Sequence, residues 1–242
     1  MQCSKTWLEN KGISAVIFDF DGTLYDNSKV AKYLIKAKPL SSFRMLADRK
    51  ARKALKGSYY ETEEAFLFEY SKVASKKCLF PCRAKAFLAW YQNTYMPLMT
   101  KVLYDKCRAG AGAGNGADSS GASEVNTVFA ELHSFNIKTA ILSDYPFVKE
   151  RMAALGISDK NVDLIKASQE LGGLKPAAAL FEKVAGQLGV EVSHTLVIGD
   201  RDDTDGQGAR NAGMQYHIIN REFPATCFSQ YLPFAASDGE PS

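Results

Sequence analysis

The sequence predicts an α/β fold, in which a parallel sheet forms the core and a group of helices is inserted near its start. Three observations predict it. A short apolar run, residues 13–18, ends in two carboxylates; a long stretch of helical periodicity follows without a strand; short apolar runs then alternate with helical segments. Alternating strands and helices imply parallel strands joined by right-handed crossovers.

The inserted helices come directly after the first strand. Apolar residues at helical spacing form four stripes between residues 30 and 95, which begin at Val30, Phe43, Phe66 and Ala84. About four consecutive helices with no strand between them indicate an inserted bundle. Beyond it the pattern predicts helix 124–135, strand 137–142, helix 147–155, strand 162–165, helix 177–188, strand 194–198 and strand 215–219.

A glycine-rich segment, residues 108–123, separates the bundle from the resumed alternation. Residues 112–117 formally match the glycine fingerprint of dinucleotide sites, but that fingerprint needs a preceding buried strand, and residues 104–108 are not one. The abundance of Gly, Ala and Ser indicates a flexible insertion. We also expect the tail from Phe234 onward to be disordered.

Composition narrows the function classes. A chain of 242 residues with 46% hydrophobic residues can bury one core and a second, smaller one. A formal charge of +3 is too slight to indicate nucleic-acid or membrane binding, and no apolar segment could span a bilayer. The first ten residues lack the features of a secretory signal, and five scattered cysteines fit reduced thiols, so we expect a cytoplasmic protein. Nothing in the sequence indicates an oligomeric state.

Two carboxylates, Asp19 and Asp21, emerge where the first strand ends. In open α/β sheets, ligands bind at the carboxyl ends of the strands. One carboxylate can attack an electrophile there while its neighbour moves protons. The alternative is an ordinary strand followed by an Asp-Gly turn.

Three further positions repeat this placement. Ser143 ends the strand at 137–142, Lys175 precedes a proline that opens a helix, and the strand at 194–198 leads into an acidic loop that includes Asp200 and Asp205. Each feature also has an ordinary structural interpretation. Ser143 could cap a helix or lie in a turn, Lys175 could be solvated, and the acidic loop could be solvated. Converging carboxylates repel one another, and a divalent cation relieves that repulsion.

Taken together, these motifs resemble a known family. Asp19-Phe20-Asp21-Gly22-Thr23-Leu24, Ser143, Lys175-Pro176, and Gly199-Asp200 with Asp205 look like the four motifs of the haloacid dehalogenase superfamily of hydrolases. The helical stretch after Leu24 resembles the cap of its C1-capped branch, which is similar to phosphoglycolate phosphatase. The resemblance implies a Rossmann-like core at residues 1–24 and 96–242, with a helical cap at residues 25–95.

The resemblance also implies a role for each motif. Asp19 would attack phosphorus to form an aspartyl phosphate, and Asp21 would act first as an acid and then as a base. Ser143 and Lys175 would bind the phosphoryl group. Mg²⁺ would be held by Asp19, Asp200 and the backbone carbonyl of Asp21, supported by Asp205.

Two positions depart from the family pattern. Asp144 follows Ser143 where many relatives carry a neutral residue, so its charge either faces the substrate phosphate or points away; we group it with Ser143 and Lys175 as substrate-binding. Asp202 and Asp203 could be solvated or could compete as ligands, and spacing favours Asp200 and Asp205.

The expected function is a Mg²⁺-dependent phosphatase acting on a small phosphorylated metabolite. Alternatives are a phosphomutase or phosphotransferase of the same family, or a binding protein that keeps the fold without turnover. Asp21 argues against a dehalogenase, which uses no general acid at this position.

Ten basic residues lie in and around the first two cap helices. They either form a solvated face or draw anionic substrate toward the site: Lys29, Lys32, Lys36, Lys38, Arg44, Arg49, Lys50, Arg52, Lys53 and Lys56.

Overall fold

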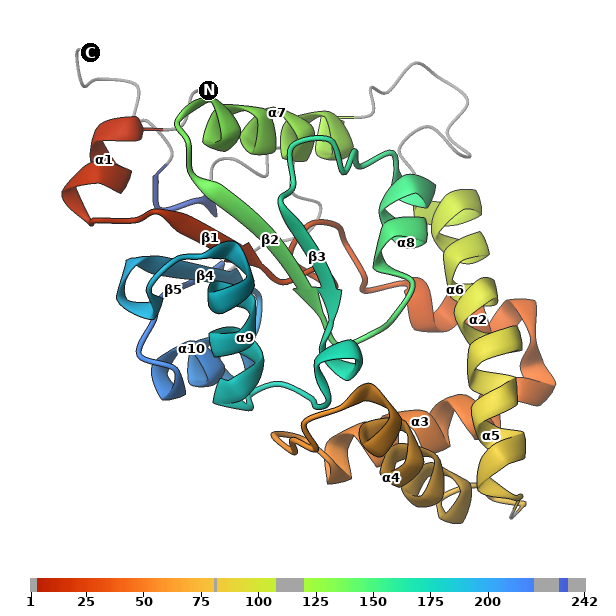
Figure 1. The fold of residues 1–242 in the computed structure, drawn as a ribbon. Helices are drawn as coiled ribbons and strands as arrows, with labels where there is room; N and C mark the ends of the chain where they lie inside the picture. Colours follow the sequence, from red (N-terminus) through yellow and green to blue (C-terminus); the bar gives the residue numbers. More distant parts are fainter. Residues whose placement is uncertain (1–3, 81, 108–119, 220–230, 235–242) are drawn as a thin grey trace.

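A five-stranded parallel sheet forms the centre of the molecule (Figure 1). The computed structural model describes residues 4–80, 82–107, 120–219 and 231–234. The strand order is β3-β2-β1-β4-β5, and all four neighbouring pairs run parallel. This confirms the predicted fold class. The strands are β1 (Ala15–Phe18), β2 (Lys138–Ser143), β3 (Leu164–Ala167), β4 (Thr195–Gly199) and β5 (Gln215–Ile218).

Helices cover both faces of the sheet because alternate strand residues point to opposite sides. Ile17, Ala140 and Val197 pack with α9 (Ala178–Leu188) and α10 (Gln207–Asn211) on one face. Phe18 and Ile141 belong to the larger core on the other face, which includes residues of α1 (Lys5–Asn10), α7 (Ser120–Ser134) and α8 (Val148–Leu155). Strands buried on both faces explain why their sequences read as continuous apolar runs.

The helices between β1 and α7 lie beside the sheet at the right and lower right of Figure 1. Two π-helical segments, residues 91–95 and 103–107, continue the run of the last two helices. The predicted boundary between cap and core at residue 95 stays a prediction, and the helical run continues across it. The helices are α2 (Val30–Ala37), α3 (Ser42–Ala54), α4 (Glu63–Lys76), α5 (Ala84–Trp90) and α6 (Met96–Val102).

Local sequence explains where α4 begins. The hydroxyl of Thr62 accepts a hydrogen bond from the N–H of Ala65 at 3.2 Å, which satisfies one of the free donors of the first turn. Glu63 and Glu64 follow at once, and their charges favour the positive end of the helix dipole.

The structure describes only parts of the two segments that were expected to be irregular, the glycine-rich insertion and the C-terminal tail. Residues 108–119 of the predicted glycine-rich insertion lie outside the described residues, whereas residues 120–123 belong to α7, which begins earlier than expected. Phe234 is fully buried and its ring lies 6.2 Å from that of Trp7, so the expectation of a disordered tail is wrong at this residue. Residues 235–242 lie outside the described part. No helix among the described residues is long and apolar enough to cross a membrane.

Candidate active site

The sheet register brings the motif residues together at one edge. Phe18 of β1 lies beside Ile141 of β2 and Ile198 of β4, so the residues that follow these three emerge at the same level. The N–H of Asp19 still donates to the carbonyl of Ile198 at 2.8 Å, which extends the ladder by one residue. The sheet therefore fixes the backbone of Asp19 independently of the contacts that its side chain makes.

A buried lysine links two carboxylates of the site. Lys175 Nζ lies 2.6 Å from Asp19 Oδ1 and 2.8 Å from Asp205 Oδ1. The second oxygen of Asp19 accepts from the hydroxyl of Thr23 at 2.9 Å. Burial lowers the pKa of Lys175, but the charges of Asp19 and Asp205 outweigh that effect and raise it, so the ammonium stays charged.

Asp19, Asp200 and Asp205 form a group of converging carboxylates. One oxygen from each lies within 4.8 Å of the others. Burial raises the pKa of Asp19 well above its ordinary value, against the opposing charge of Lys175. Burial, followed by the charge of Asp205, raises the pKa of Asp200 to about 6. Asp19 and Asp200 therefore favour their protonated forms until a cation offsets the negative charge.

Two glycines allow the backbone to lie close to the carboxylates of this group. A Cβ on Gly22, whose φ is +96°, would lie 2.3 Å from Asp200 Oδ2, and one on Gly199 would lie 2.4 Å from the Asp205 carboxyl carbon. Only glycine leaves room for these two carboxylates. Three carboxylate oxygens are hard donors of the kind that Mg²⁺ prefers, so the residues present fit that ion.

Asp21 sits in different surroundings from Asp19. Its Oδ2 accepts from the Ser143 hydroxyl at 2.8 Å, and its Oδ1 accepts from Arg151 at 2.6 Å and from the Tyr25 hydroxyl. Burial pushes the pKa of Asp21 upward, but the charge and hydrogen bonds of Arg151, with those of Tyr25 and Ser143, outweigh it and leave the pKa below its ordinary value. Asp21 is therefore ionised at neutral pH in this state.

Arg151 is a site residue that the sequence reasoning missed. Its side chain is fully buried, donates to the Ser143 hydroxyl at 2.7 Å and to the Tyr145 carbonyl at 2.7 Å, and packs over the Phe20 ring. It lies in the first turn of α8, eight residues beyond Ser143 in the chain. An arginine in an otherwise apolar stripe of that helix is the signal that could have found it, because an unpaired charge is almost never buried.

Asp144 accepts hydrogen bonds from two neighbouring segments of the core. Its Oδ1 accepts from the Ser168 hydroxyl at 2.7 Å and from the Lys175 N–H at 3.2 Å, which ties the end of β2 to the loop that carries the lysine. Asp144 also lines the cavity at the strand ends. Substrate binding by Asp144 stays a prediction, and the structure adds a role in holding Lys175.

The remaining acids of the last motif are engaged elsewhere. Asp202 pairs with Arg210 at 2.7 Å, and Asp203 pairs with Arg201 at 2.8 Å and with Lys56 of the segment after α3. Both acids are exposed. They lie outside the three-carboxylate group, in agreement with the preference for Asp200 and Asp205.

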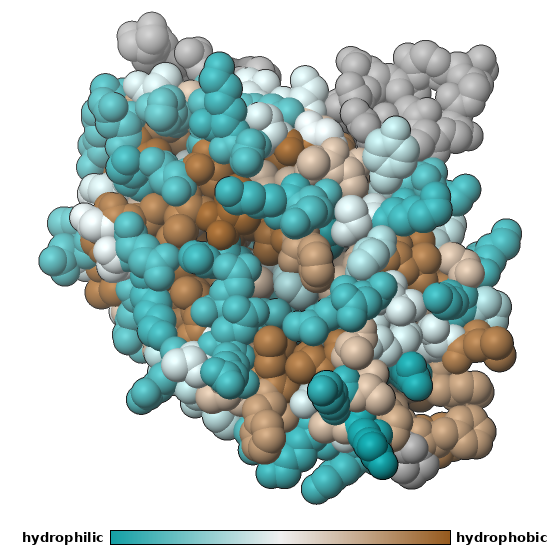
Figure 2. Space-filling view, turned by 45° about the vertical axis from the view of Figure 1, so that its right-hand side comes forward, coloured by the Kyte–Doolittle hydropathy of each residue, from teal (hydrophilic) through white to brown (hydrophobic). Residues whose placement is uncertain are grey.

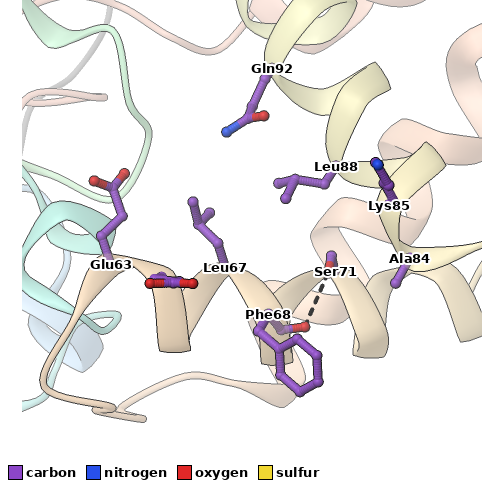
Figure 3. A pocket seen from close by; sticks show the side chains of 9 residues that line it. Glu63, Leu67, Phe68, Ser71, Ala84, Lys85, Leu88 and Gln92 are labelled. Carbon is purple, nitrogen blue, oxygen red and sulfur yellow. Dashed lines mark hydrogen bonds between the residues drawn. The ribbon is translucent and has the colours of Figure 1, made fainter.

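One cavity of about 580 Å³ opens onto the site and is lined by Asp19, Asp21, Lys175, Asp200 and Asp205 together with helices α2, α3 and α6. A larger hollow of about 760 Å³ lies between α4 and α5, where Leu67 and Leu88 point toward each other (Figure 3). No motif residue lines this second hollow. The cavity at the strand ends is therefore the candidate active site.

A parallel α/β sheet that presents two carboxylates, a serine, a buried lysine and an acidic loop at its carboxyl edge defines a class of hydrolases. A family model described as haloacid dehalogenase-like hydrolase matches residues 13–213, and the chain belongs to that family. The resemblance stated from the sequence is confirmed, and the chain is a hydrolase of this family.

Individual relatives span most of the chain. Glyceraldehyde 3-phosphate phosphatase of Methanothermobacter thermautotrophicus is 25% identical over 221 residues, which cover 87% of each protein. A β-phosphoglucomutase structure from Clostridium difficile has a TM-score of 0.56 at 23% identity and covers 86% of this chain and 85% of that one. A predicted phosphoglycolate phosphatase from Haemophilus somnus 129pt has a TM-score of 0.54 at 15% identity and covers 86% of each chain. The two structures support the fold.

Proposed function

We propose that the protein is a Mg²⁺-dependent phosphatase that hydrolyses a small phosphomonoester through an aspartyl phosphate on Asp19. The observation that carries this proposal is the second carboxylate, Asp21, held by three hydrogen-bond donors beside Asp19. Displacement of an alkoxide needs a proton donor, whereas displacement of a halide does not. A relative at 25% identity is also named as a phosphatase.

Asp19 is the nucleophile in this proposal. One of its oxygens attacks phosphorus, the P–O bond to the leaving group breaks, and an acyl phosphate forms on Asp19. Thr23 and Lys175 hold the carboxylate in one orientation. The lysine ammonium also neutralises part of the phosphate charge, while the Ser143 hydroxyl can donate to a phosphoryl oxygen.

Asp21 carries the proton. Because its pKa is low in this state, it must gain a proton when substrate binds. The arriving phosphate raises that pKa, since a nearby like charge disfavours the ionised form. Asp21 then protonates the leaving oxygen and, as a carboxylate, deprotonates the water that hydrolyses the acyl phosphate, releasing inorganic phosphate and restoring Asp19.

Asp19, Asp200 and Asp205 would hold Mg²⁺, joined by the backbone carbonyl of Asp21. When bound, the ion would offset the negative charge shared by the carboxylates and the phosphate and so permit their approach. Asp19 needs this help more than an ordinary aspartate, because burial raises its pKa and favours the protonated, non-nucleophilic form.

The test is phosphate release from a panel of phosphomonoesters with and without Mg²⁺. We expect release that a chelator abolishes and Mg²⁺ restores, and that Asp19→Asn abolishes in a folded protein. Exposed Asp202→Asn is the matched control and should keep activity. Transfer of label between two sugar phosphates without net release would favour the phosphomutase alternative, and full activity in Asp19→Asn would contradict the proposed nucleophile.

A further inference from the structure

The active-site cavity has two chemically different ends. The core end carries the motif carboxylates and Lys175, whereas the helices beside it add a wall formed mainly by apolar side chains. Ile35 and Leu46 are about half exposed on this wall, so they face the cavity rather than the protein core. The principal apolar members are Leu34, Ile35, Met45, Leu46 and Met99, and Tyr95 adds an aromatic ring that carries one hydroxyl.

Contacts at one end of α3 show how this wall is arranged. Arg52 donates to the carbonyl of Asp144 at 2.6 Å, and the N–H of Gly57 donates to the carbonyl of Lys175 at 3.1 Å, so the C-terminal end of α3 is anchored on the core. Leu46 lies about 9 Å along the helix axis from Arg52, at 1.5 Å per residue. The apolar part of the wall is therefore remote from the anchored end.

Polar residues of the wall lie mostly toward the core. Asn27 and Ser28 precede α2, close in sequence to the first motif, and Arg49 is about one turn from the anchored Arg52. Among the described lining residues of α3, only Ser42 places a polar group beyond Leu46. Groups that could bind an anion or a hydroxyl are thus concentrated near the position of the phosphate.

We propose that this apolar wall binds the leaving-group part of the substrate, so that the enzyme prefers alkyl and other largely apolar phosphomonoesters over polyhydroxylated ones. The inference rests on the proposed phosphatase function. Burying an apolar chain here removes apolar surface from water on both partners. A hydroxyl in the same place would lose its hydrogen bonds to water without a protein partner, which is costly for each group.

The first test compares kcat/KM for propyl phosphate and glycerol 3-phosphate, which share a three-carbon chain and differ by two hydroxyls. We expect propyl phosphate to be favoured about tenfold or more. Across methyl, ethyl, butyl and hexyl phosphate, kcat/KM should rise by roughly two- to fourfold per methylene. Equal or better use of glycerol 3-phosphate, or a flat alkyl series, would overturn the inference and leave the phosphatase proposal standing.

The second test changes the wall itself. Leu46→Gln and Ile35→Gln should each lower the hexyl-to-methyl ratio of kcat/KM by severalfold. Phe43→Gln is the matched control, because Phe43 lies on the same helix with 46% of its surface exposed, against 50% for Leu46, and does not line the cavity. An unchanged ratio in both wall variants, or an equal loss in the control, would overturn the assignment of the wall.

The experiments distinguish a failure of the phosphatase proposal from a failure of the apolar-wall proposal. If no phosphomonoester is hydrolysed in the presence of Mg²⁺, including the activated ester p-nitrophenyl phosphate, both proposals fall. Hydrolysis of p-nitrophenyl phosphate without any preference in the alkyl series contradicts only the apolar wall.

Discussion

Asp19 and Asp21 are two residues apart, yet their surroundings shift the pKa values of the two carboxyl groups in opposite directions. Asp19 shares Lys175 with Asp205 and lies near Asp200, whereas Asp21 pairs with the guanidinium of Arg151, whose other contacts are the Ser143 hydroxyl and backbone carbonyls. Burial raises the pKa of Asp19, while Arg151 and two hydroxyl donors overcome burial and lower the pKa of Asp21. These directions describe the protein without ion or substrate, and the proposed roles require the reverse: a cation must favour ionised Asp19, and a bound phosphate must favour protonated Asp21.

The proposed proton transfer predicts a leaving-group effect in Asp21→Asn. An amide cannot protonate the departing oxygen, so kcat for an alkyl phosphate should fall by roughly 100- to 10,000-fold. Hydrolysis of p-nitrophenyl phosphate should fall less in the first step, because that leaving group needs little protonation. Single-turnover rates of acyl-phosphate formation measure this step alone. Equal losses for both esters would contradict an acid role for Asp21.

The raised pKa of Asp200 predicts that protons compete with Mg²⁺. Below about pH 6 this carboxylate is protonated in the metal-free protein, so binding the ion must release a proton. Calorimetric titration should show affinity for Mg²⁺ falling about tenfold or more per pH unit below that value. In Asp200→Asn the affinity at pH 7 should already be weak. A wild-type affinity that stays constant from pH 7 to pH 5 would contradict this coupling.

Residue-level prediction from sequence worked where a motif marks the position. Asp19 was selected by its place at the end of the first strand and Asp200 and Asp205 by spacing, and the structure brings the three within one cluster. Arg151 and Arg52 were missed or misread, because basic residues on amphipathic helices usually indicate a solvated face. Which arginine is buried depends on distant partners, such as Asp21 for Arg151, and local spacing does not encode them.

At the scale of elements, α3 connects the cap helices to the core through Arg52, an arginine whose side chain is only 11% exposed. Arg52 donates to Asp48 at 2.9 Å, to Tyr91 at 2.6 Å and to the carbonyl of Asp144, and stacks on the Tyr145 ring. The sequence analysis counted this residue among possible surface charges, and the structure corrects that interpretation. Asp48 is fully buried; its Oδ1 accepts from Arg52 and from the Tyr70 hydroxyl, whereas its Oδ2 has no hydrogen-bond partner among the described residues, so Asp48 depends on Arg52 for a compensating positive charge.

This dependence predicts a large stability effect. Arg52→Met should lower the free energy of unfolding by about 3–5 kcal/mol, because it leaves the Asp48 charge buried and unpaired. Lys50→Met, at an exposed position of the same helix, should change it by less than about 0.5 kcal/mol. Urea denaturation measures both. The double variant Asp48→Leu with Arg52→Met should recover much of the loss, and failure to do so would show that Arg52 acts through the core contacts instead.

The strands β1, β2 and β4 were predictable because each is mostly an apolar run buried on both faces, whereas the edge strands β3 and β5 are only partly buried. The shift of the third strand, expected at 162–165 and observed as β3 at 164–167, reflects the polar residue Lys166 within it. The π-helical segments around α6 have no sequence signature, since they result from packing within a long helical run. Phe234 likewise follows a stretch rich in turn residues, and only the contact with Trp7 shows that it is buried.

At the scale of the whole molecule, charge and apolar surface are distributed unevenly. Figure 2 shows several apolar patches on one face of the molecule, among them a group at the lower right. Phe43 and Phe80 are exposed and pack edge to face 6.2 Å apart. Basic side chains of α2 and α3 accompany this surface, while the cavity floor is acidic. An anionic substrate therefore meets cations before it meets the carboxylates.

This arrangement predicts electrostatic steering by the exposed lysines of α3. Replacing Lys50 and Lys53 by Gln should lower kcat/KM at low salt, because a positive surface raises the encounter rate with an anion. The deficit should shrink as salt rises, since the screening length is about 8 Å at physiological ionic strength. Arg52 is left intact because its burial would confound the result.

The salt series separates steering from contact. If both lysines act only on encounter, kcat stays unchanged at every salt concentration while kcat/KM recovers. Replacing Lys5 and Lys11, two exposed lysines outside the cap helices, preserves the same change in net charge and should leave the low-salt value close to wild type. An equal deficit in this control would mean that total charge, rather than the position of the α3 lysines, governs encounter. A fall in kcat itself would place Lys50 or Lys53 in contact with substrate or in the closure of the cap over the site.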